Sequence, residues 1–243
     1  MKQFIAKALF YLSLLATLTF ILSGYGYQWE LWTLGMGFSL LRYSAYAAIG
    51  LLVTQLLALF FMKESGAKAV SMLVVGVMLT LLISGTALYW QQKAQGVPPI
   101  HDITTDMENP PEFVAMVRLR EDAQNPPEYS GEEAAEAQRE AYPNVQPLMT
   151  AAPKQEVIDE IVTLIVSRNW DLVSINRQEG RVEATEKLAW FGFKDDVVLR
   201  ITETDDGSRV DMRSKSRIGR SDIGVNADRI ESFLRDLENR LES

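Results

Sequence analysis

Residues 69–90, AVSMLVVGVMLTLLISGTALYW, contain no charged side chain over 22 positions. Residues 43–62, YSAYAAIGLLVTQLLALFFM, are likewise uncharged, and residues 4–22 carry a single charge, Lys7, near their start. A helix rises 1.5 Å per residue, so about 20 apolar residues cross a hydrocarbon layer of roughly 30 Å. The three stretches therefore predict membrane-spanning helices, and residues 1–92 are predicted to form a membrane domain.

The first stretch has a second interpretation, because Lys2 and Lys7 beside an apolar run are also typical of a secretory signal peptide. The residues that follow it, Ser23-Gly24-Tyr25-Gly26-Tyr27, lack the small-residue pattern of a cleavage site. A retained helix is therefore favoured. Residues 23–42 are predicted to form the loop that leads into the second span.

Charge divides the chain near the same place. Residues 1–90 carry five Lys or Arg and two Asp or Glu, net +3, whereas residues 91–243 carry 19 and 30, net −11. The N-terminal lysines and the loop that contains Lys63 and Lys68 are expected in the cytoplasm by the positive-inside rule. The part of the chain after the third span is then predicted to lie outside, in the periplasm or its equivalent.

The composition excludes several classes of protein. The chain has no cysteine, so it has no disulfide, thiolate metal site or cysteine nucleophile. Its single histidine, His101, excludes a multi-histidine metal centre within one chain. The acidic soluble part argues against nucleic-acid binding, and the absence of Asp, Glu, Arg and His from the middle of the spans argues against a transporter. We predict no cofactor and no metal, and we favour a non-enzymatic role.

The soluble part is predicted to have two portions. All nine prolines lie between Pro98 and Pro153, and proline is excluded from helix interiors and central strands. Residues 93–152 are therefore predicted to form an irregular Pro-rich segment that wraps across a folded domain at residues 153–243.

Apolar periodicity in residues 153–243 predicts the order α-β-β-β-β-α. The strands are expected at residues 170–176, 182–188, 197–201 and 209–217. The last helix is expected to begin near Asn226, a residue typical of an N-cap. This order indicates the α+β fold class, a two-layer domain with an antiparallel sheet and helices on one face.

The densest charged stretch is Ser208–Arg229. Strand alternation places Arg209, Asp211, Arg213, Lys215 and Arg217 on one face, with Ser214 and Ser216 on the other. Guanidinium groups bind phosphate or carboxylate, so this stretch could bind an anionic ligand such as a lipid head group. The competing interpretation is a solvated strand face paired with Glu183, Glu186 or Asp196. The candidate binding residues are Arg213, Ser214, Ser216, Arg217, Arg220, Asp222, Asn226 and Arg229.

A second motif is the aromatic cluster Trp190, Phe191 and Phe193. These side chains could close one end of the core. They could also form an exposed apolar patch that contacts lipid or a partner.

A third motif places His101 beside Asp102, with Asp106 four residues further on. A histidine near carboxylates is compatible with acid-base catalysis. Because neighbouring residues in a chain point in different directions, a structural role that pins the Pro-rich segment to the domain is favoured.

Four runs occur in order between residues 97 and 240: PPIHDITTDMENPPEF, QREAYPNVQPL, EATEKLAWFGFKDDVVLRI and GSRVDMRSKSRIGRSDIGVNADRI. Together they resemble the domain-of-unknown-function family catalogued as number 1499. The resemblance implies a bacterial envelope protein, often with membrane segments before the domain, and it carries no established activity. It also implies that the Pro-rich segment belongs to the domain.

Three hypotheses follow for an inner-membrane protein with these parts. The extracytoplasmic domain could bind another envelope protein or an anionic lipid. The chain could be an envelope hydrolase that uses His101 with Asp102 or Asp106. It could also be a scaffold or assembly subunit of a membrane complex, held mainly by its helices. The bilayer is the expected partner in all three, nucleic acid in none, and the oligomeric state is left open.

Overall fold

The computed structural model describes residues 1–61 and 66–242. They form two compact units, each described by itself below. The first unit consists of residues 1–95 together with Trp190–Gly192, and the second consists of residues 96–189 and those from Phe193 onward. The predicted end of the second span at Met62 and the loop residue Lys63 lie outside the described residues.

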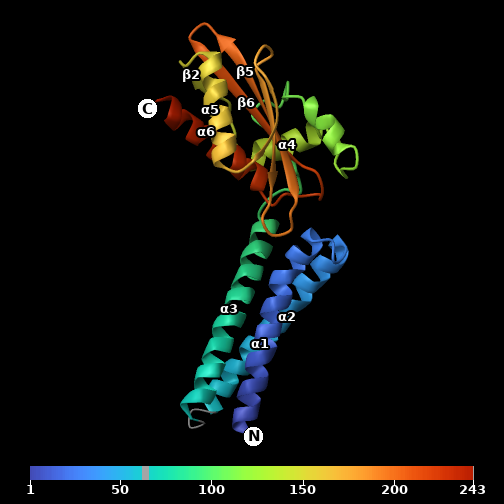
Figure 1. Ribbon diagram of the computed structural model, residues 1–243, viewed down its shortest axis with the longest axis vertical. Coiled ribbons are helices and arrows are strands. Elements are labelled where there is room, and N and C mark those ends of the chain that lie inside the picture. The colour runs from blue at the N-terminus through green and yellow to red at the C-terminus, as the bar shows by residue number, and fades with distance from the viewer. Residues whose placement is uncertain (62–65, 243) are drawn as a thin grey trace. The chain divides into compact units, whose positions relative to one another are not determined.

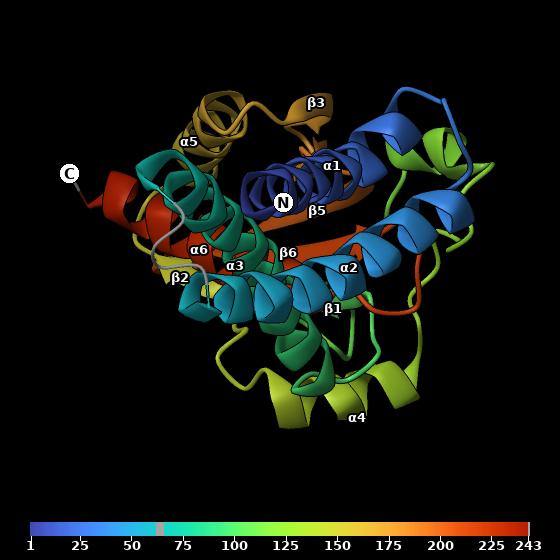
Figure 2. The same cartoon turned by 90° about the horizontal axis from the view of Figure 1, so that it is seen from below.

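Three long helices make up most of the first unit, α1 (Lys2–Gln28), α2 (Leu34–Phe61) and α3 (Ala67–Gln95). Figure 2 shows them side by side. Each is long and apolar enough to cross a membrane, and each extends beyond the predicted span. The prediction of a loop over residues 23–42 is wrong, because α1 continues to Gln28 and α2 begins at Leu34. The apolar run marks only the part that suits hydrocarbon, and the helical backbone continues through the aromatic residues that follow.

The outer surface of this unit is apolar. Leu15, Phe60 and Leu82 are more than half exposed, at 60%, 65% and 68%. Water would make such a surface costly, whereas a bilayer is as apolar as the side chains themselves. The chain is therefore a membrane protein by the length of its helices and by the surface that they present.

A buried polar cluster joins the three helices. Gln55 of α2 is fully buried, and its Nε2 donates to Ser13 Oγ of α1 at 2.6 Å. Its Oε1 accepts from Thr80 Oγ1 of α3 at 3.1 Å. Gly76 of α3 leaves room for the amide, because a Cβ at that position would collide with Gln55. One side chain thus fixes the register of all three helices.

The second unit contains ten helices and strands within the described residues. Its element order confirms the predicted order α-β-β-β-β-α after residue 153 and the α+β fold class. Before that residue, the Pro-rich segment, which was predicted to be irregular, contributes two short strands and two short helices. The elements are β1 (Asp102–Thr104), η1 (Ala115–Arg120), α4 (Glu132–Ala141), β2 (Leu148–Thr150), α5 (Lys154–Ser167), β3 (Asp171–Asn176), β4 (Arg181–Lys187), β5 (Lys194–Thr204), β6 (Gly207–Ser216) and α6 (Val225–Leu241).

The six strands form one antiparallel sheet in the order β1-β6-β5-β4-β3, and β2 also pairs with β6. Because β1 pairs with Arg213–Lys215 and β2 with Ser208–Val210, the two short strands lie end to end along β6. The Pro-rich segment therefore supplies the whole of this sheet edge. Short strands suit such a segment, since proline removes ladder donors.

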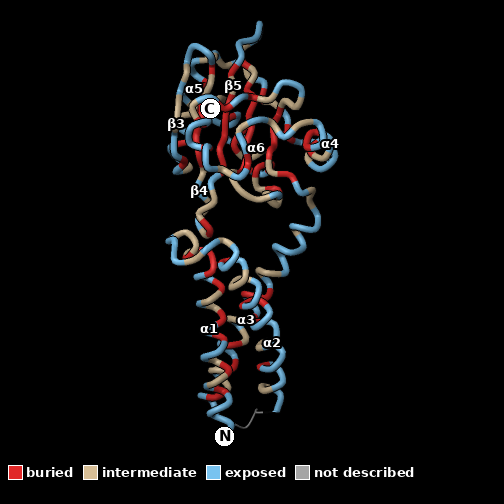
Figure 3. Tube along the Cα trace, turned by 90° about the vertical axis from the view of Figure 1, so that its right-hand side faces the viewer, coloured by how far each residue is buried: buried red, intermediate tan, exposed pale blue. Residues whose placement is uncertain are grey.

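The two faces of the sheet have different covers. Helices α5 and α6 lie against one face (Figure 1), where Ile161, Phe233 and strand residues such as Leu199 form the main core. Residues 105–130, called the wrap from here on, cover the other face, where Phe113 and Met116 contact Val198. Buried positions run along the strands as a result (Figure 3).

We expect Gln55→Leu to weaken the helix bundle, because it removes three hydrogen bonds between helices, with Leu9 O, Ser13 and Thr80. Such bonds contribute about 0.6 kcal/mol each on average within membrane bundles. The measurement is the SDS midpoint for unfolding of the full chain in dodecyl maltoside, followed by tryptophan fluorescence.

Thr54→Val is the matched control for this change. The Thr54 hydroxyl is exposed and bonds only the Gly50 carbonyl of its own helix, so its loss should leave the midpoint unchanged. Equal shifts in the two variants would contradict the assigned role of Gln55.

Candidate functional site

The basic residues of β6 lie on the face of the sheet that the wrap covers. Arg213 and Lys215 are 2% and 1% exposed. The interpretation of this strand face as solvated is therefore wrong, because Arg213 and Lys215 are buried. A strand's own alternation cannot reveal that an irregular segment more than 80 residues earlier lies over it.

Asp102 of β1 is the first of two buried carboxylates that these cations surround. Arg213 donates to it through Nε at 2.8 Å and through a terminal nitrogen at 2.9 Å. Lys215 Nζ lies 3.1 Å from the same carboxylate. The N–H and hydroxyl of Ser130 donate to it as well, at 3.0 and 3.1 Å. Both oxygens of Asp102 thus accept from donors inside the domain.

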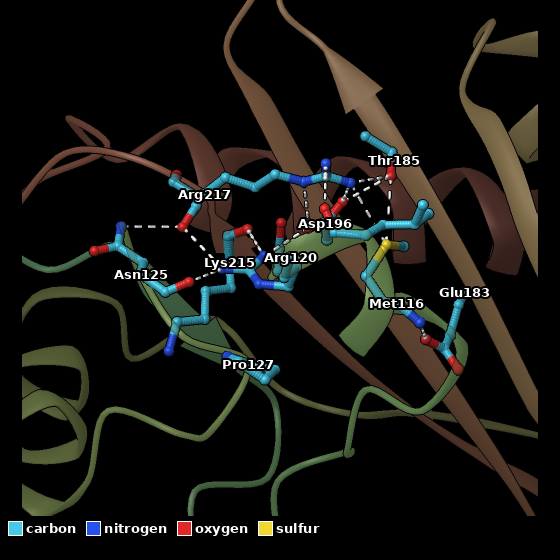
Figure 4. Close-up of polar contacts among 12 residues, drawn as sticks. Met116, Arg120, Asn125, Pro127, Glu183, Thr185, Asp196, Lys215 and Arg217 are labelled. Carbon is cyan, nitrogen blue, oxygen red and sulfur yellow. Dashed lines mark hydrogen bonds and ion pairs between the residues drawn. The ribbon is translucent and has the colours of Figure 1, made fainter. Parts of the chain in front are cut away.

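Asp196 of β5 is the second buried carboxylate (Figure 4). Arg120 donates to it at 2.6 Å, and Arg217 donates to both of its oxygens, at 2.8 and 2.9 Å. The Thr185 hydroxyl donates to it at 2.7 Å. Arg120 comes from η1 in the wrap, so this carboxylate ties the wrap to the sheet.

Four cations thus face two carboxylates, and the surplus donors bind main-chain carbonyls of the wrap. Arg213 donates to Pro111 O and Pro127 O, at 3.2 and 3.0 Å. Lys215 Nζ donates to Glu128 O at 2.5 Å, and Arg217 donates to Leu119 O at 2.8 Å. We call Asp102, Arg120, Asp196, Arg213, Lys215 and Arg217 the wrap-face cluster.

Glu183 and two aromatic rings complete the attachment of the wrap. The buried carboxylate of Glu183 accepts the N–H groups of Val114 and Met116 at the start of η1, at 3.2 and 2.8 Å. The Arg213 guanidinium lies over the rings of Phe113 and Tyr129, 4.9 and 5.5 Å from their centroids. Such stacking stabilises a cation that has left water.

The pKa values follow from burial and pairing. Burial would raise the pKa of Asp102, but hydrogen bonds from Arg213 outweigh it and hold that pKa below its usual value. Burial lowers the pKa of Lys215, against the opposing charge of Asp102. Because the folded-state pKa of Asp102 is depressed, its contribution to stability is present above the unfolded pKa and is lost as the pH falls through the folded value.

Four other candidate residues form a second cluster on the face of the sheet that α6 covers. They are Ser214, Ser216, Asn226 and Arg229. The Ser214 hydroxyl donates to Asn226 Oδ1 at 2.6 Å, and Asn226 Nδ2 donates to Ser216 Oγ at 3.1 Å. Arg229 binds Asp195 at 2.6 Å and also contacts Glu186, Ser214 and Asn226. Buried ion pairs and hydrogen bonds therefore engage these groups as well.

Asn226 is not the N-cap of α6, so that prediction is wrong. Helix α6 begins at Val225, and the side chain of Asn226 is buried against β6. Asp222 satisfies the helix start instead, because its carboxylate accepts the N–H groups of Gly224 at 2.9 Å and Asn226 at 2.7 Å. Burial raises the pKa of Asp222. Arg220 lies in the preceding loop and is exposed.

The proposed acid-base residues do not converge. Asp102 binds Arg213 and Lys215, and Asp106 binds Arg200 at 2.8 Å. His101 is half-buried, and burial lowers its pKa, with a further contribution from Lys215. The His101 carbonyl accepts from Ser216 N–H at 3.0 Å, which attaches the Pro-rich segment to β6.

The aromatic cluster is divided between the units. Trp190 and Phe191 belong to the first unit, where their rings lie 5.1 Å from Phe20 and 5.2 Å from Phe38. Phe193 belongs to the second unit, and its carbonyl accepts from Leu188 N–H at 2.8 Å.

A groove remains at the sheet edge beside α6, with a volume of about 520 Å³. Residues 144–149 form one wall and α6 forms the other. Val145, Leu148, Ile230 and Leu234 are buried beneath it, so polar and charged groups make up most of the surface that the groove exposes. Its charged residues are Glu231, Arg235 and Glu238. Within residues 1–61 and 66–242, no group of three His, Asp or Glu side chains is placed to hold a metal.

Sequence reasoning missed Arg120 and this groove. Arg120 lies in a run that reads as exposed and charged, AMVRLRED, and nothing local marks it for burial. The groove joins two segments about 80 residues apart, and neither has a residue pattern that indicates a binding site. Only the pairing of β2 with β6 brings these segments together.

Comparison with known proteins gives one match. The family model described as "Protein of unknown function (DUF1499)" matches residues 102–237, which is more than half of the chain. None of the curated proteins and none of the solved structures matches.

We expect Asp102→Asn to destabilise the soluble domain by about 3–5 kcal/mol, because it leaves Arg213 and Lys215 buried without their carboxylate. The measurement is guanidinium unfolding of the full chain in detergent, followed by the fluorescence change of the soluble domain.

Asp236→Asn is the control, since Asp236 pairs with Arg168 at the surface. An exposed pair contributes about 0–1 kcal/mol. If the two variants unfolded at the same guanidinium concentration, the central role of Asp102 would be refuted.

Proposed function

The chain belongs to the DUF1499 family of proteins of unknown function, and from that premise we propose that it is a membrane-anchored binding protein of the bacterial envelope. The three apolar helices hold it in the cytoplasmic membrane. The soluble domain faces outward and binds another envelope protein. This function needs no catalytic group and no cofactor.

The distribution of charge supports the proposed sidedness. Lys2 and Lys7 precede the first span, and Lys63 and Lys68 lie between the second and third. The segment just after the third span has only Lys93. Positive charge is retained on the cytoplasmic side during insertion, so the acidic domain is exported.

The groove between residues 144–149 and α6 is the observation that carries the proposed activity. Of the cations proposed for an anionic ligand, Arg213, Arg217 and Arg229 are engaged by internal ion pairs, and Arg220 alone is exposed, which disfavours lipid head groups. Glu231, Arg235 and Glu238 make no ion pair with any described residue, so their charges remain available. A concave surface with available charges can bind a partner of complementary charge.

The proposed sidedness is tested with single cysteines, since the chain has none of its own. Val166 and Lys68 are both exposed. In intact spheroplasts, a membrane-impermeant maleimide should label Val166→Cys at once and Lys68→Cys only after lysis. The reverse order of labelling would place the domain in the cytoplasm and refute the proposal.

Partner binding is tested by photo-crosslinking in cells. Benzoylphenylalanine at Arg235, in the groove, should give a discrete ultraviolet-dependent adduct with another envelope protein. The same residue at Val166, which is exposed but outside the groove, should give none. The same pattern from both positions, or no adduct from position 235, would count against a binding role for the groove.

A further inference from the structure

The backbone of β6 shows which groups of its neighbours are free. Ser216 N–H donates to His101 O, and Thr105 N–H donates to Met212 O. In an antiparallel ladder the N–H and C=O of one residue point to the same side, and successive residues alternate. The even-numbered residues of β6 therefore direct their backbone groups toward β1 and β2.

The register of β2 then fixes the direction of its own groups. Leu148 opposes Val210 and Thr150 opposes Ser208, so these two pairs are the hydrogen-bonded ones. The N–H and C=O of Met149, between them, point away from β6. Because β2 pairs with β6 alone among the described strands, that side of β2 is an open edge.

This open edge borders the groove. Residues Asn144–Met149 form one wall, and α6 lies opposite. An extended chain laid along the wall would meet the free N–H and C=O of Met149, which is 58% exposed, and would place alternate side chains beside Glu231, Arg235 and Glu238 of α6.

The charges near the groove favour a partner of positive charge. Glu231 and Glu238 flank Arg235 along α6, which leaves one net negative charge at the groove. The surrounding residues 91–243 carry a net charge of −11. A field of this sign attracts cations over a distance as well as at contact.

We propose that the groove binds an extended, basic peptide segment of another envelope protein, which adds to β2 as a further strand of the sheet. The inference rests on the proposed function and names its partner class. Main-chain hydrogen bonds to Met149 supply affinity, and basic side chains that face Glu231 and Glu238 supply selection.

The probe is a fluorescein-labelled decapeptide of alternating valine and lysine, and binding to the full chain in neutral detergent is followed by anisotropy. A matched peptide with glutamate in place of lysine should bind at least tenfold more weakly. In the double variant Glu231→Lys, Glu238→Lys this preference should reverse. Equal affinity of the two peptides for the unaltered chain would overturn the selection for basic segments.

Met149→Pro tests strand addition itself. Proline removes the outward N–H but no bond to β6, so the sheet edge tolerates it. Met149→Ala shortens the same side chain and keeps the N–H. We expect a loss of at least tenfold in affinity for Met149→Pro relative to Met149→Ala, with unchanged circular dichroism and melting temperature in both.

The outcomes separate the two proposals. Equal affinities for the proline and alanine variants would overturn strand addition, even where position 235 crosslinks to a partner in cells. No binding of the valine-lysine peptide would overturn the basic-strand partner. A crosslinked species of twice the chain mass would identify a second copy as the occupant and overturn the proposed partner class.

Discussion

The burial of four cations against two carboxylates is the constraint on which the soluble domain depends. Moving a charge out of water costs several kcal/mol unless it gains partners of similar quality. Asp102 and Asp196 carry two negative charges against the four positive charges of the cations. The N–H donors that the carboxylates leave over bind main-chain carbonyls of the wrap, such as those of Pro111 and Pro127. The wrap forms no strand of the sheet, and its prolines Pro110, Pro111, Pro126 and Pro127 have no N–H to donate to a ladder. The sheet supplies donors to the wrap instead.

Much of the fold was predictable because its signals are local. Uncharged runs of about 20 residues gave the three helices, and alternation gave the strands from β3 to β6. The helix ends were not predictable, since a helix continues past its apolar part. β1 and β2 were missed because three residues are too few to show a period. Gln55 was missed as well, because an uncharged polar residue within a span does not interrupt the apolar run.

The candidate site was less predictable, for a physical reason. Alternation places Arg213 and Arg217 on one face correctly, but exposure depends on what lies over that face. Arg120 and Asp102 reach the cluster from segments about 76 to 111 residues away in sequence. The adjacency of His101 and Asp102 was compatible with catalysis, but a structural role was favoured, and Asp102 is a partner of Arg213 on the wrap-covered face. Charges that appeared available for a ligand hold the domain together, and the open surface lies at the sheet edge.

The use of carbonyls to hold the wrap has a consequence for divergence among related chains. Every amino acid supplies a carbonyl, so most positions along residues 105–130 can change identity without removing an anchor. Arg120, which donates to Asp196 from within that segment, is an exception. On the sheet, Arg213 and Lys215 have no such freedom, since no other residue type offers the same donors. We therefore expect relatives of this chain to vary in the covering segment, outside side chains such as Phe113, Met116 and Tyr129 that contact the sheet, while the charged positions beneath it stay fixed.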